Sequence, residues 1–321
     1  MRVLSSEYVA AVVVFYHPDS AAIEHANRLA QWLTVIIVDN SEEPLQAPRQ
    51  VKQIETSDNK QHQGEPLTLS KQCVYIRNGE NVGIAQALNQ GLQYATNAQK
   101  QWCLLLDQDS IIDRDFWLAM RSIPTENAHP IAAIVPRYFA KNLNKYGDII
   151  QVGRWSIQRR SVECKLSEAS DSLQFIPASY AITSGSLVNL QELQKIGLHD
   201  ESLFIDFVDI EWGLRANSQG AQILTNISAV LTQQLGDSPI KMFGCSVVNH
   251  SPIRHYYYFR NVFLMLRKQH VPRIWKLYEL AKLPIRFLLY SIFTTNRIDQ
   301  CQSMLLGILH GIQNKKGKKR Q

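Results

Sequence analysis

Short, continuously apolar segments constrain the fold of this chain more than any other feature of its sequence. The run Tyr8–Tyr16 is apolar and rich in β-branched residues, which predicts a strand buried on both faces. The same pattern continues as predicted strands at 34–38, 73–76, 102–106 and 131–135, with predicted helices at 20–33 and 83–95. This alternation predicts an α/β fold in which helices cover both faces of a parallel sheet.

Polar residues gather where the predicted strands end. The clusters are Tyr16-His17, Asp39-Asn40, Asn78–Asn81 and Asp107–Asp109. Ligands of open α/β sheets bind beyond the carboxyl ends of the strands, so we expect a ligand site there. The glycine signatures of dinucleotide-binding and P-loop proteins are missing from the sequence, which argues against both classes. Residues 42–70 are polar and contain three prolines, which predicts a long loop.

Composition and charge exclude several classes of protein. Of the 321 residues, 45% are hydrophobic, enough to form a packed core. No apolar stretch reaches the roughly 18 residues of a membrane span, and the first apolar run lacks the cleavage site of a signal peptide, so we expect no export. The five cysteines include no C-x-x-C pair, which favours a reducing compartment. We expect Cys73 and Cys103 to be buried core residues.

The positive charge is concentrated at one end of the chain. Residues 254–321 contain 14 Lys and Arg against two acidic residues, a net charge of +12, which leaves −6 for residues 1–253 because the whole chain carries +6. We therefore expect two parts: a catalytic domain over 1–253, and a basic, aromatic-rich helical extension over 254–321. The last residues, 314–321, are expected to form a disordered basic tail.

Two acidic groups carry the strongest chemical signal. Asp107 and Asp109 follow a predicted buried strand, where their oxygens suit Mg²⁺ or Mn²⁺ beside a diphosphate. The alternative is that Asp109 or Asp113 caps the next helix. Asp206, Asp209 and Glu211 form a second acidic group, in which neighbouring charge raises a carboxyl pKa towards the range of a general base. The alternative is that these acids favour a helix N-terminus through its dipole.

Weaker polar signals lie at the other strand ends. Asp39-Asn40-Ser41 suits hydrogen bonding to a nucleotide base or ribose, or else a local turn. Asn81-Val82-Gly83 opens a helix and offers backbone N–H groups to a phosphate or sugar, or else Asn81 is only a cap. The small-residue stretch around Ser184 would let a ligand approach the backbone closely.

Taken in order, these motifs resemble glycosyltransferase family 2, and within it the bacterial rhamnosyltransferases. The matching blocks are Val12–Pro18, Ile37–Ser41, Asn81-x-Gly83-x-Ala85-x-Ala87-x-Asn89-x-Gly91, Leu105–Ser110, Thr183–Ser186, Phe204–Trp212 and Arg254–Asn261. The resemblance covers residues 9–261. It implies a GT-A, Rossmann-like nucleotide-sugar transferase fold and an inverting single displacement from dTDP-L-rhamnose to a hydroxyl of a lipid-linked or growing surface polysaccharide, such as the O antigen of lipopolysaccharide.

The resemblance also implies a role for each matching residue. Tyr16 and Asp39 would lie at the nucleotide, with Asn81 and Gly83 beside its ribose or phosphates. Asp109 would bind the Mg²⁺ or Mn²⁺ ion directly, and Asp107 would approach the ion or the ribose. Asp209 would be the catalytic base. Ser184, Glu211 and Trp212 would contact substrate, with Trp212 on the acceptor side.

One departure from the family pattern concerns the metal. Relatives have a histidine in an H-x-x-G segment after the acidic block, whereas this chain has Gln233-Gln234-Leu235-Gly236. Glutamine offers a carbonyl oxygen, which is a weaker ligand than imidazole for a transition metal. We therefore expect weak metal binding, unless His250 or His255 substitutes.

The basic extension has three interpretations. It is a solvated surface, a nucleic-acid site, or a membrane-binding segment. We favour an anionic membrane surface, because apolar residues flanked by Lys and Arg suit helices that lie on lipid. We expect no nucleic-acid partner, since no groove-reading motif occurs. The resemblance implies a bacterial protein, peripheral on the cytoplasmic face of the inner membrane.

Two other functions stay open on the sequence. The same chemistry with a UDP-hexose or UDP-galactofuranose donor would use the same motifs. A catalytically silent scaffold in a polysaccharide assembly complex would explain Gln233. A panel of nucleotide-sugar donors separates these possibilities.

Overall fold

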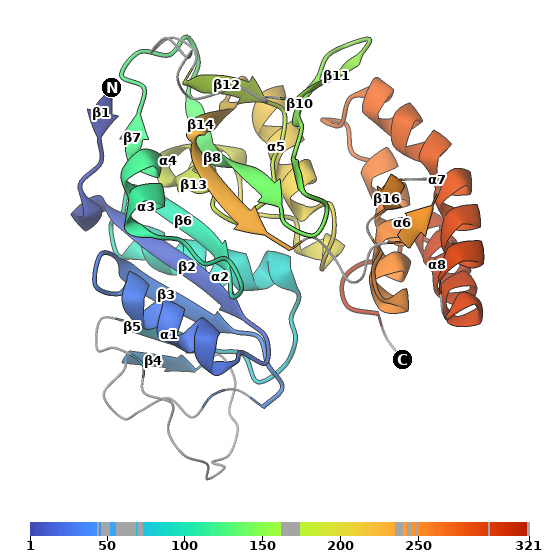
Figure 1. The fold of residues 1–321 in the computed structure, drawn as a ribbon, viewed down its shortest axis with the longest axis horizontal. Coiled ribbons are helices and arrows are strands. Elements are labelled where there is room, and N and C mark those ends of the chain that lie inside the picture. Colours follow the sequence, from blue (N-terminus) through green and yellow to red (C-terminus); the bar gives the residue numbers. More distant parts are fainter. Residues whose placement is uncertain are drawn as a thin grey trace.

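The fold is built around one large sheet, which Figure 1 shows crossing the molecule from β4 to β12. The structure is a computed structural model that describes the chain except residues 44, 46–51, 56–68, 70–72, 162–173, 235–239, 243–244, 248, 295 and 320–321. Its strands are β1 (Arg2–Val3), β2 (Val9–Phe15), β3 (Thr34–Asp39), β4 (Lys52–Glu55), β5 (Cys73–Arg77), β6 (Trp102–Asp107), β7 (Ser122–Ile123), β8 (Ile131–Ala140), β9 (Lys145–Tyr146), β10 (Ile149–Val152), β11 (Ile157–Arg160), β12 (Phe175–Ala178), β13 (Leu187–Asn189), β14 (Gln222–Gln233), β15 (Ile240–Met242) and β16 (Cys245–Val247). Its helices are α1 (Ser20–Leu29), α2 (Ile84–Asn97), α3 (Arg114–Met120), α4 (Leu190–Ile196), α5 (Val208–Ser218), α6 (Pro252–Leu266), α7 (Arg273–Phe293) and α8 (Arg297–Ile312).

The predicted strands and helices of the N-terminal half are confirmed, but the sheet is mixed rather than parallel. Its strand order is β12-β14-β8-β13-β6-β2-β3-β5-β4. Strands β4, β5, β3, β2 and β6 pair in parallel, whereas β13 is inserted antiparallel between β6 and β8. The expectation of a purely parallel sheet was therefore wrong beyond β6. Strand β13 is short and carries no periodicity that distinguishes its direction.

The predicted loop over 42–70 also contains a strand. Strand β4 pairs in parallel with β5 at the edge of the sheet. Its sequence, Lys-Gln-Ile-Glu, is polar because an edge strand tolerates solvent, and this polarity concealed it. Most of the remaining predicted loop lies outside the described residues, as does Cys164.

Alternation along β2 divides the core into two layers. Val9, Ala11, Val13 and Phe15 pack on the face covered by α1 and α3. Ala10, Val12 and Val14 pack on the face covered by α2, α4 and α5. Every residue of β2 is buried, as the continuous apolar run predicts. Cys73 and Cys103 are buried free thiols in the same layers, as expected.

The two helices that flank the strand ends begin where side-chain caps place them. Asp19 accepts a hydrogen bond from the Ala22 N–H at 2.8 Å at the start of α1. Asp113 accepts one from the Phe116 N–H at 2.7 Å at the start of α3. Asp113 is therefore the N-cap that the D-x-D alternative required, which leaves Asp109 without that role.

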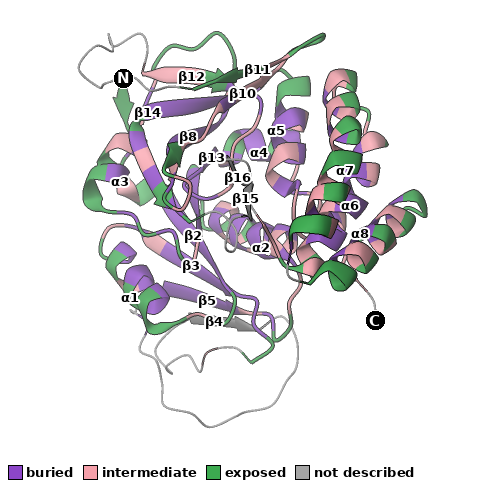
Figure 2. Ribbon diagram, turned by 45° about the vertical axis from the view of Figure 1, so that its right-hand side comes forward, coloured by how far each residue is buried: buried purple, intermediate pink, exposed green. Residues whose placement is uncertain are grey.

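The three C-terminal helices share a core with the sheet domain instead of standing apart from it. A third apolar cluster joins Leu203, Phe207 and Val208 to side chains of α6, α7 and α8, including Phe259 and Trp275. Figure 2 shows the inward sides of these helices as buried and much of α7 and α8 as exposed. The chain that follows α8 is also ordered. The Gly317 N–H donates to the Ser202 carbonyl at 2.7 Å, and the Lys319 N–H donates to the Tyr257 hydroxyl at 2.9 Å.

The expected disorder of residues 314–321 was therefore wrong for the described part, which extends to Lys319. Charge alone predicts solvation of such a tail, but backbone groups, rather than its lysine charges, make these contacts. The residues that order the tail belong to α6, where the Tyr257 hydroxyl and the Arg260 guanidinium bond to the tail backbone.

Helix α2 packs so closely on β2 that only glycine fits at one position. A Cβ on Gly91 would lie 2.5 Å from Val12 Cγ1. We expect Gly91→Ala to lower the free energy of unfolding by about 1–2 kcal/mol, because overpacking costs about 1–3 kcal/mol and alanine regains up to about 1 kcal/mol in a helix. Urea unfolding measures this. Gln93→Ala, on the exposed side of the same helix, is the control, and equal midpoints for the two variants would contradict the close packing.

Candidate active site

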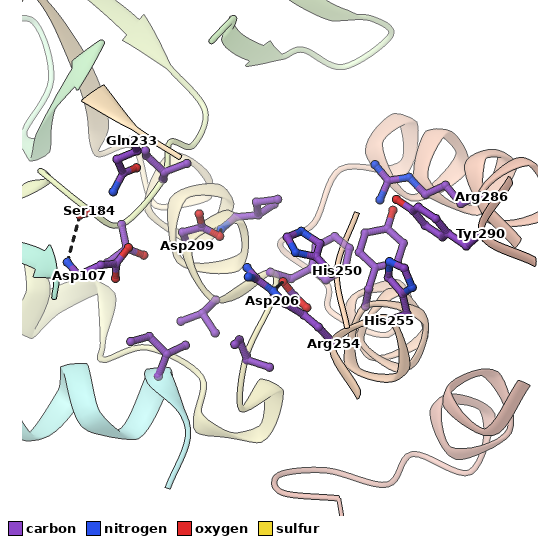
Figure 3. Close-up of a pocket in the computed structure, with 18 residues that line it drawn as sticks. Asp107, Ser184, Asp206, Asp209, Gln233, His250, Arg254, His255, Arg286 and Tyr290 are labelled. Carbon is purple, nitrogen blue, oxygen red and sulfur yellow. Dashed lines mark hydrogen bonds and ion pairs between the residues drawn. The ribbon is translucent and has the colours of Figure 1, made fainter. Parts of the chain in front are cut away.

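A cavity of about 560 Å³ opens beyond the end of β6, between the sheet and the C-terminal helices. Figure 3 shows carboxylates at one end, and arginine and aromatic side chains of α6 and α7 at the other. Its polar lining consists of Asp107, Thr183, Ser184, Asp206, Asp209, Gln233, His250, Arg254, His255, Tyr258, Arg286 and Tyr290. The cavity thus lies where the end of a parallel strand predicts a ligand site.

Asp107 ends β6 and faces the cavity (Figure 3). Its N–H donates to Ser184 Oγ at 3.1 Å, which fixes the strand end against the 182–186 turn. Burial raises the pKa of Asp107 to about 6, the negative charges of Asp109 and Asp209 add to this, and Arg254 opposes it. An enclosed carboxylate beside two others is a position that a bound cation would stabilise.

Asp209 lies in the first turn of α5 and reaches the same cavity. Burial raises its pKa to about 6, and the charge of Asp206 adds to this, whereas backbone N–H groups and Arg254 oppose it. A carboxyl group with a pKa near 6 is ionised at neutral pH and still basic enough to accept a proton. Its geometry and pKa suit a general base.

Asp206 is a third acid of the cavity. Its Oδ1 forms an ion pair with Arg254 Nε at 3.2 Å. Its Oδ2 is buried and has no hydrogen-bond partner among the described residues. Burial raises its pKa, and Arg254 and Arg286 oppose the shift. A buried acceptor that faces a cavity without a partner is available to a ligand hydroxyl.

The loop before α5 has unusual backbone geometry. Phe204, Asp206 and Phe207 have φ angles of 65°, 63° and 65°, a region that side chains other than glycine rarely adopt. Each such residue costs about 1–3 kcal/mol, and such residues cluster at functional sites. This geometry turns Asp206 and Asp209 towards the cavity.

Asp109 lies outside the cavity lining and is exposed. It is nevertheless near enough for its charge to raise the pKa of Asp107. Between the two acids, Gln108 Oε1 accepts a hydrogen bond from the Tyr16 N–H at 2.8 Å, and Gln108 Nε2 donates to the Tyr16 carbonyl. The structure therefore brings Tyr16 to the tip of β6, where the residue is 44% exposed.

Asp39 ends β3 and forms its hydrogen bonds within the protein. It is fully buried, and its carboxylate accepts hydrogen bonds from the Ser41 N–H, the Leu45 N–H and the Tyr75 hydroxyl at 3.0, 2.9 and 2.5 Å. Those partners occupy both oxygens, so the side chain shapes the turn after β3. The local-turn alternative therefore describes Asp39.

The Asn81 side chain supports the 81–83 turn, whereas the N-cap of α2 is Gly83. Asn81 Oδ1 accepts from the Gly83 N–H at 3.0 Å and from Asn40 Nδ2 at 3.1 Å. Gly83 is buried with φ +89°, and a Cβ there would lie 2.6 Å from the ring of Phe204. Glycine is therefore required at this position by contact with the 204–207 loop.

Glu211 and Trp212 lie away from the cavity, unlike the expectation. Glu211 is 1% exposed and pairs with Arg215, Lys268 and His270 at 3.0, 3.5 and 2.9 Å. Trp212 Nε1 donates to the Gly197 carbonyl at 2.9 Å within the core under the sheet. Helical rotation of about 100° per residue turns position 211 away from the cavity side of Asp209. Trp212 lies three residues after Asp209, and its packing in the core keeps its ring out of the cavity.

Gln233 and Ser184 are both hydrogen-bonded to the Ser110 hydroxyl. Gln233 Nε2 and Ser184 Oγ both donate to Ser110 Oγ, at 2.5 Å each. Gln233 therefore lies beside Asp107 in the cavity, where the family pattern implies a histidine (Figure 3). The following Leu235 and Gly236 lie outside the described residues.

Sequence reasoning missed the part of the lining that α6 and α7 contribute. Arg254 and Tyr258 are four residues apart on α6, as are Arg286 and Tyr290 on α7, so each pair presents one helical face. The guanidinium carbon of Arg286 lies 4.4 Å from the ring centroid of Tyr258. His250 is neutral, since burial and Arg254 lower its pKa to about 3. The i, i+4 spacing of arginine and tyrosine in the sequence could have indicated this part of the lining.

A divalent cation fits this site if the substrate supplies part of its ligands. Among the described residues, no group of three or more His, Cys, Asp or Glu side chains forms a metal cage. Mg²⁺ typically uses one or two carboxylates together with substrate phosphates. The repulsion between Asp107 and Asp109 that raises the Asp107 pKa matches such a site.

Comparisons with known proteins agree with this geometry. The family model described as "Glycosyl transferase family 2" matches residues 21–178. A Shigella flexneri protein named "dTDP-rhamnosyl transferase RfbF" is 30% identical over 235 residues, which are 73% of this chain and 77% of the relative.

Solved structures support the GT-A fold. S. aureus TarS superposes with a TM-score of 0.50 at 12% identity, over 95% of this chain and 49% of TarS, so the chain spans about half of that protein. GalNAc-T7, crystallised with UDP, GalNAc and Mn²⁺, gives a TM-score of 0.48 at 14% identity, over 89% of this chain and 57% of GalNAc-T7. From its sequence relative and its fold, the chain belongs to glycosyltransferase family 2 and is a glycosyltransferase.

Proposed function

We propose that this protein transfers L-rhamnose from dTDP-L-rhamnose to a hydroxyl of a lipid-linked or growing surface polysaccharide, such as O antigen, with inversion at the anomeric carbon. The observation that carries the proposal is the pair of enclosed carboxylates, Asp107 and Asp209, facing one cavity with pKa values raised to about 6. The donor is proposed from the named activity of the 30% identical relative.

Asp209 acts as the base in this proposal. Its carboxylate takes the proton of the acceptor hydroxyl, and the acceptor oxygen forms a bond to the anomeric carbon from the opposite side of the leaving group. The bond from that carbon to the diphosphate oxygen breaks, and the electron pair leaves with the nucleotide. Asp206 Oδ2, which has no partner among the described residues, accepts a hydrogen bond from the acceptor sugar.

The donor binds at the strand ends. Tyr16 offers an exposed ring to the nucleotide, while Asp39, Asn81 and Gly83 act indirectly by shaping the turns beside it. Ser184 fixes the end of β6 through its bond with the Asp107 backbone. Asp107 and Asp109 would hold Mg²⁺ or Mn²⁺, which neutralises the charge that develops on a departing diphosphate.

The acceptor side faces a lipid surface. Helix α7 exposes Ile285, Leu288 and Ile292 at i, i+3 and i+7, and α8 exposes an apolar stripe with the same kind of spacing at Ile298, Leu305, Leu309 and Ile312. Lys and Arg side chains flank these stripes, as on helices that bind anionic lipid. No helix within the described ranges combines the length and the apolar character needed to cross a bilayer. We propose peripheral binding at the cytoplasmic face of a bacterial inner membrane.

Asp209→Asn tests the reaction. We expect the transfer rate to fall about 10²- to 10⁴-fold, because a positioned base contributes about that factor. The variant should be at least as stable as wild type at pH 7, since the raised pKa means that the folded protein favours the neutral form of this side chain. Released nucleotide is measured with dTDP-rhamnose, UDP-hexoses and UDP-galactofuranose, each with Mg²⁺.

Asp115→Asn, an exposed acid of α3, is the control and should retain wild-type turnover. Turnover only with a UDP-sugar would reassign the donor while keeping the chemistry. Wild-type protein that releases nucleotide from none of these donors would overturn the proposal and favour the scaffold alternative.

Gln233 predicts weak metal binding. We expect no micromolar affinity for Mn²⁺ in the absence of nucleotide, since the glutamine amide is a poorer ligand than imidazole and is engaged with Ser110. Isothermal titration calorimetry measures the affinity, with Gln233→His as the comparison that should bind more tightly. A micromolar dissociation constant for the wild-type protein would contradict the prediction.

Substitution of the α7 stripe tests membrane binding without removing the helices, whose buried side is part of the core. We expect Ile285→Glu combined with Leu288→Glu to lower sedimentation with anionic vesicles at least about tenfold, since each exposed side chain contributes about 1.5 kcal/mol or more when buried. Leu118→Glu, an exposed apolar position of α3, is the control. Unchanged sedimentation of the α7 variant would exclude this surface.

A further inference from the structure

We propose that Asn261 of α6 is a positioning residue that holds the 203–207 loop in the shape that directs Asp206 and Asp209 into the cavity. The inference rests on the proposed function, because it concerns how the acid and the base of that reaction are placed. Asn261 itself is fully buried and does not line the cavity, so it touches no substrate.

The loop needs an external hold because its own geometry is unfavourable. Phe204, Asp206 and Phe207 all have φ near +65°, and none is a glycine. Backbone of this kind persists only where the surrounding structure determines it. In this turn the carbonyl groups of residues 203, 205 and 206 all accept from one side chain of α6.

The side chain of Asn261 stabilises the loop through hydrogen bonds. Its Nδ2 donates to the carbonyl oxygens of Leu203, Ile205 and Asp206 at 2.9, 2.7 and 3.0 Å, so its two hydrogens are shared among three acceptors. Buried backbone carbonyls are costly when they have no partner, and no water reaches a fully buried amide to replace these bonds. Loss of the amide would therefore release the middle of the loop.

The neighbouring Arg260 fixes the orientation of the amide. Arg260 Nε donates to Asn261 Oδ1 at 2.9 Å, which assigns the oxygen to that side and leaves Nδ2 for the carbonyls. Arg260 Nη2 also donates to the Leu203 carbonyl at 2.8 Å. Arg260 is 1% exposed, so its charge is used inside the protein to support the start of the loop.

Residue 204, at the start of the loop, is held by α2 of the sheet domain and by α6. The Phe204 carbonyl accepts from the Ile84 N–H at 2.8 Å, and the Phe204 ring stacks on Tyr257 with centroids 4.9 Å apart. These contacts fix the start of the loop, while the side chains of Asp206 and Phe207 are held by Arg254 and by the Trp275 ring. Asn261 differs from them because it bonds to the backbone carbonyls inside the segment that carries Asp206 and leads into the helix of Asp209.

Asn261→Ala tests the inference through turnover and loop exchange together. We expect kcat for sugar transfer to fall at least tenfold while KM for the donor stays within twofold, because the donor contacts lie on the other wall of the cavity. Hydrogen–deuterium exchange of the amides of 204–209 should accelerate at least tenfold. Asn261→Asp keeps the volume but removes the donors, and should give the same result if the alanine variant does not fold.

The matched control is Asn226→Ala. Asn226 is also fully buried, and its Nδ2 donates to the Ala119 carbonyl at 3.0 Å, far from the cavity lining. It should lower stability without changing kcat or exchange at 204–209. Asn261 variants that match this control in both measurements would overturn the inference. If the wild-type protein has no transfer activity, the proposed function fails, and exchange at 204–209 alone decides whether Asn261 holds the loop.

Discussion

The active-site cavity depends on the enclosure of carboxylates of like charge. Asp107 comes from the end of β6, and Asp206 and Asp209 come from a loop and helix about a hundred residues later. Burial raises the pKa of all three, and Arg254 is the positive charge that opposes the shift at all three of them. The electrostatic cost that remains is relieved by a bound cation or a transferred proton, which is why such sites are functional more often than structural.

Because Arg254 belongs to α6, the C-terminal helices are part of the site. A boundary after residue 253 separates this guanidinium from the acids that it stabilises. The same helices complete a shared apolar core. Some of their basic residues therefore contact the protein, and others are exposed. Arg254 pairs with Asp206 at the cavity and Arg260 is buried in contact with the 203 carbonyl, whereas the exposed residues of α7 and α8 face solvent. Net charge alone therefore overstates the basic surface of residues 254–321.

The sequence predicted the elements whose pattern is local. Buried strands such as β2 and β6 follow from continuous apolar runs, and their ends located Asp107 and the cavity. It did not predict the direction of β13 or the existence of β4, since both depend on neighbouring strands. Asp39 and Glu211 were assigned to substrate through the family resemblance. Their partners, among them Tyr75 and Lys268, are distant in sequence and invisible to a motif.

Two walls of the cavity are joined at residue 204. Gly83 lies against Phe204 so closely that a Cβ would overlap its ring, and the Ile84 N–H bonds to the Phe204 carbonyl. The turn that opens α2 and the start of the loop that precedes α5 are therefore held together. An inverting displacement needs its base and leaving group on opposite sides of one carbon, and small errors of position are costly. Coupling the two walls through backbone contacts keeps that alignment without relying on the long side chains that line the cavity.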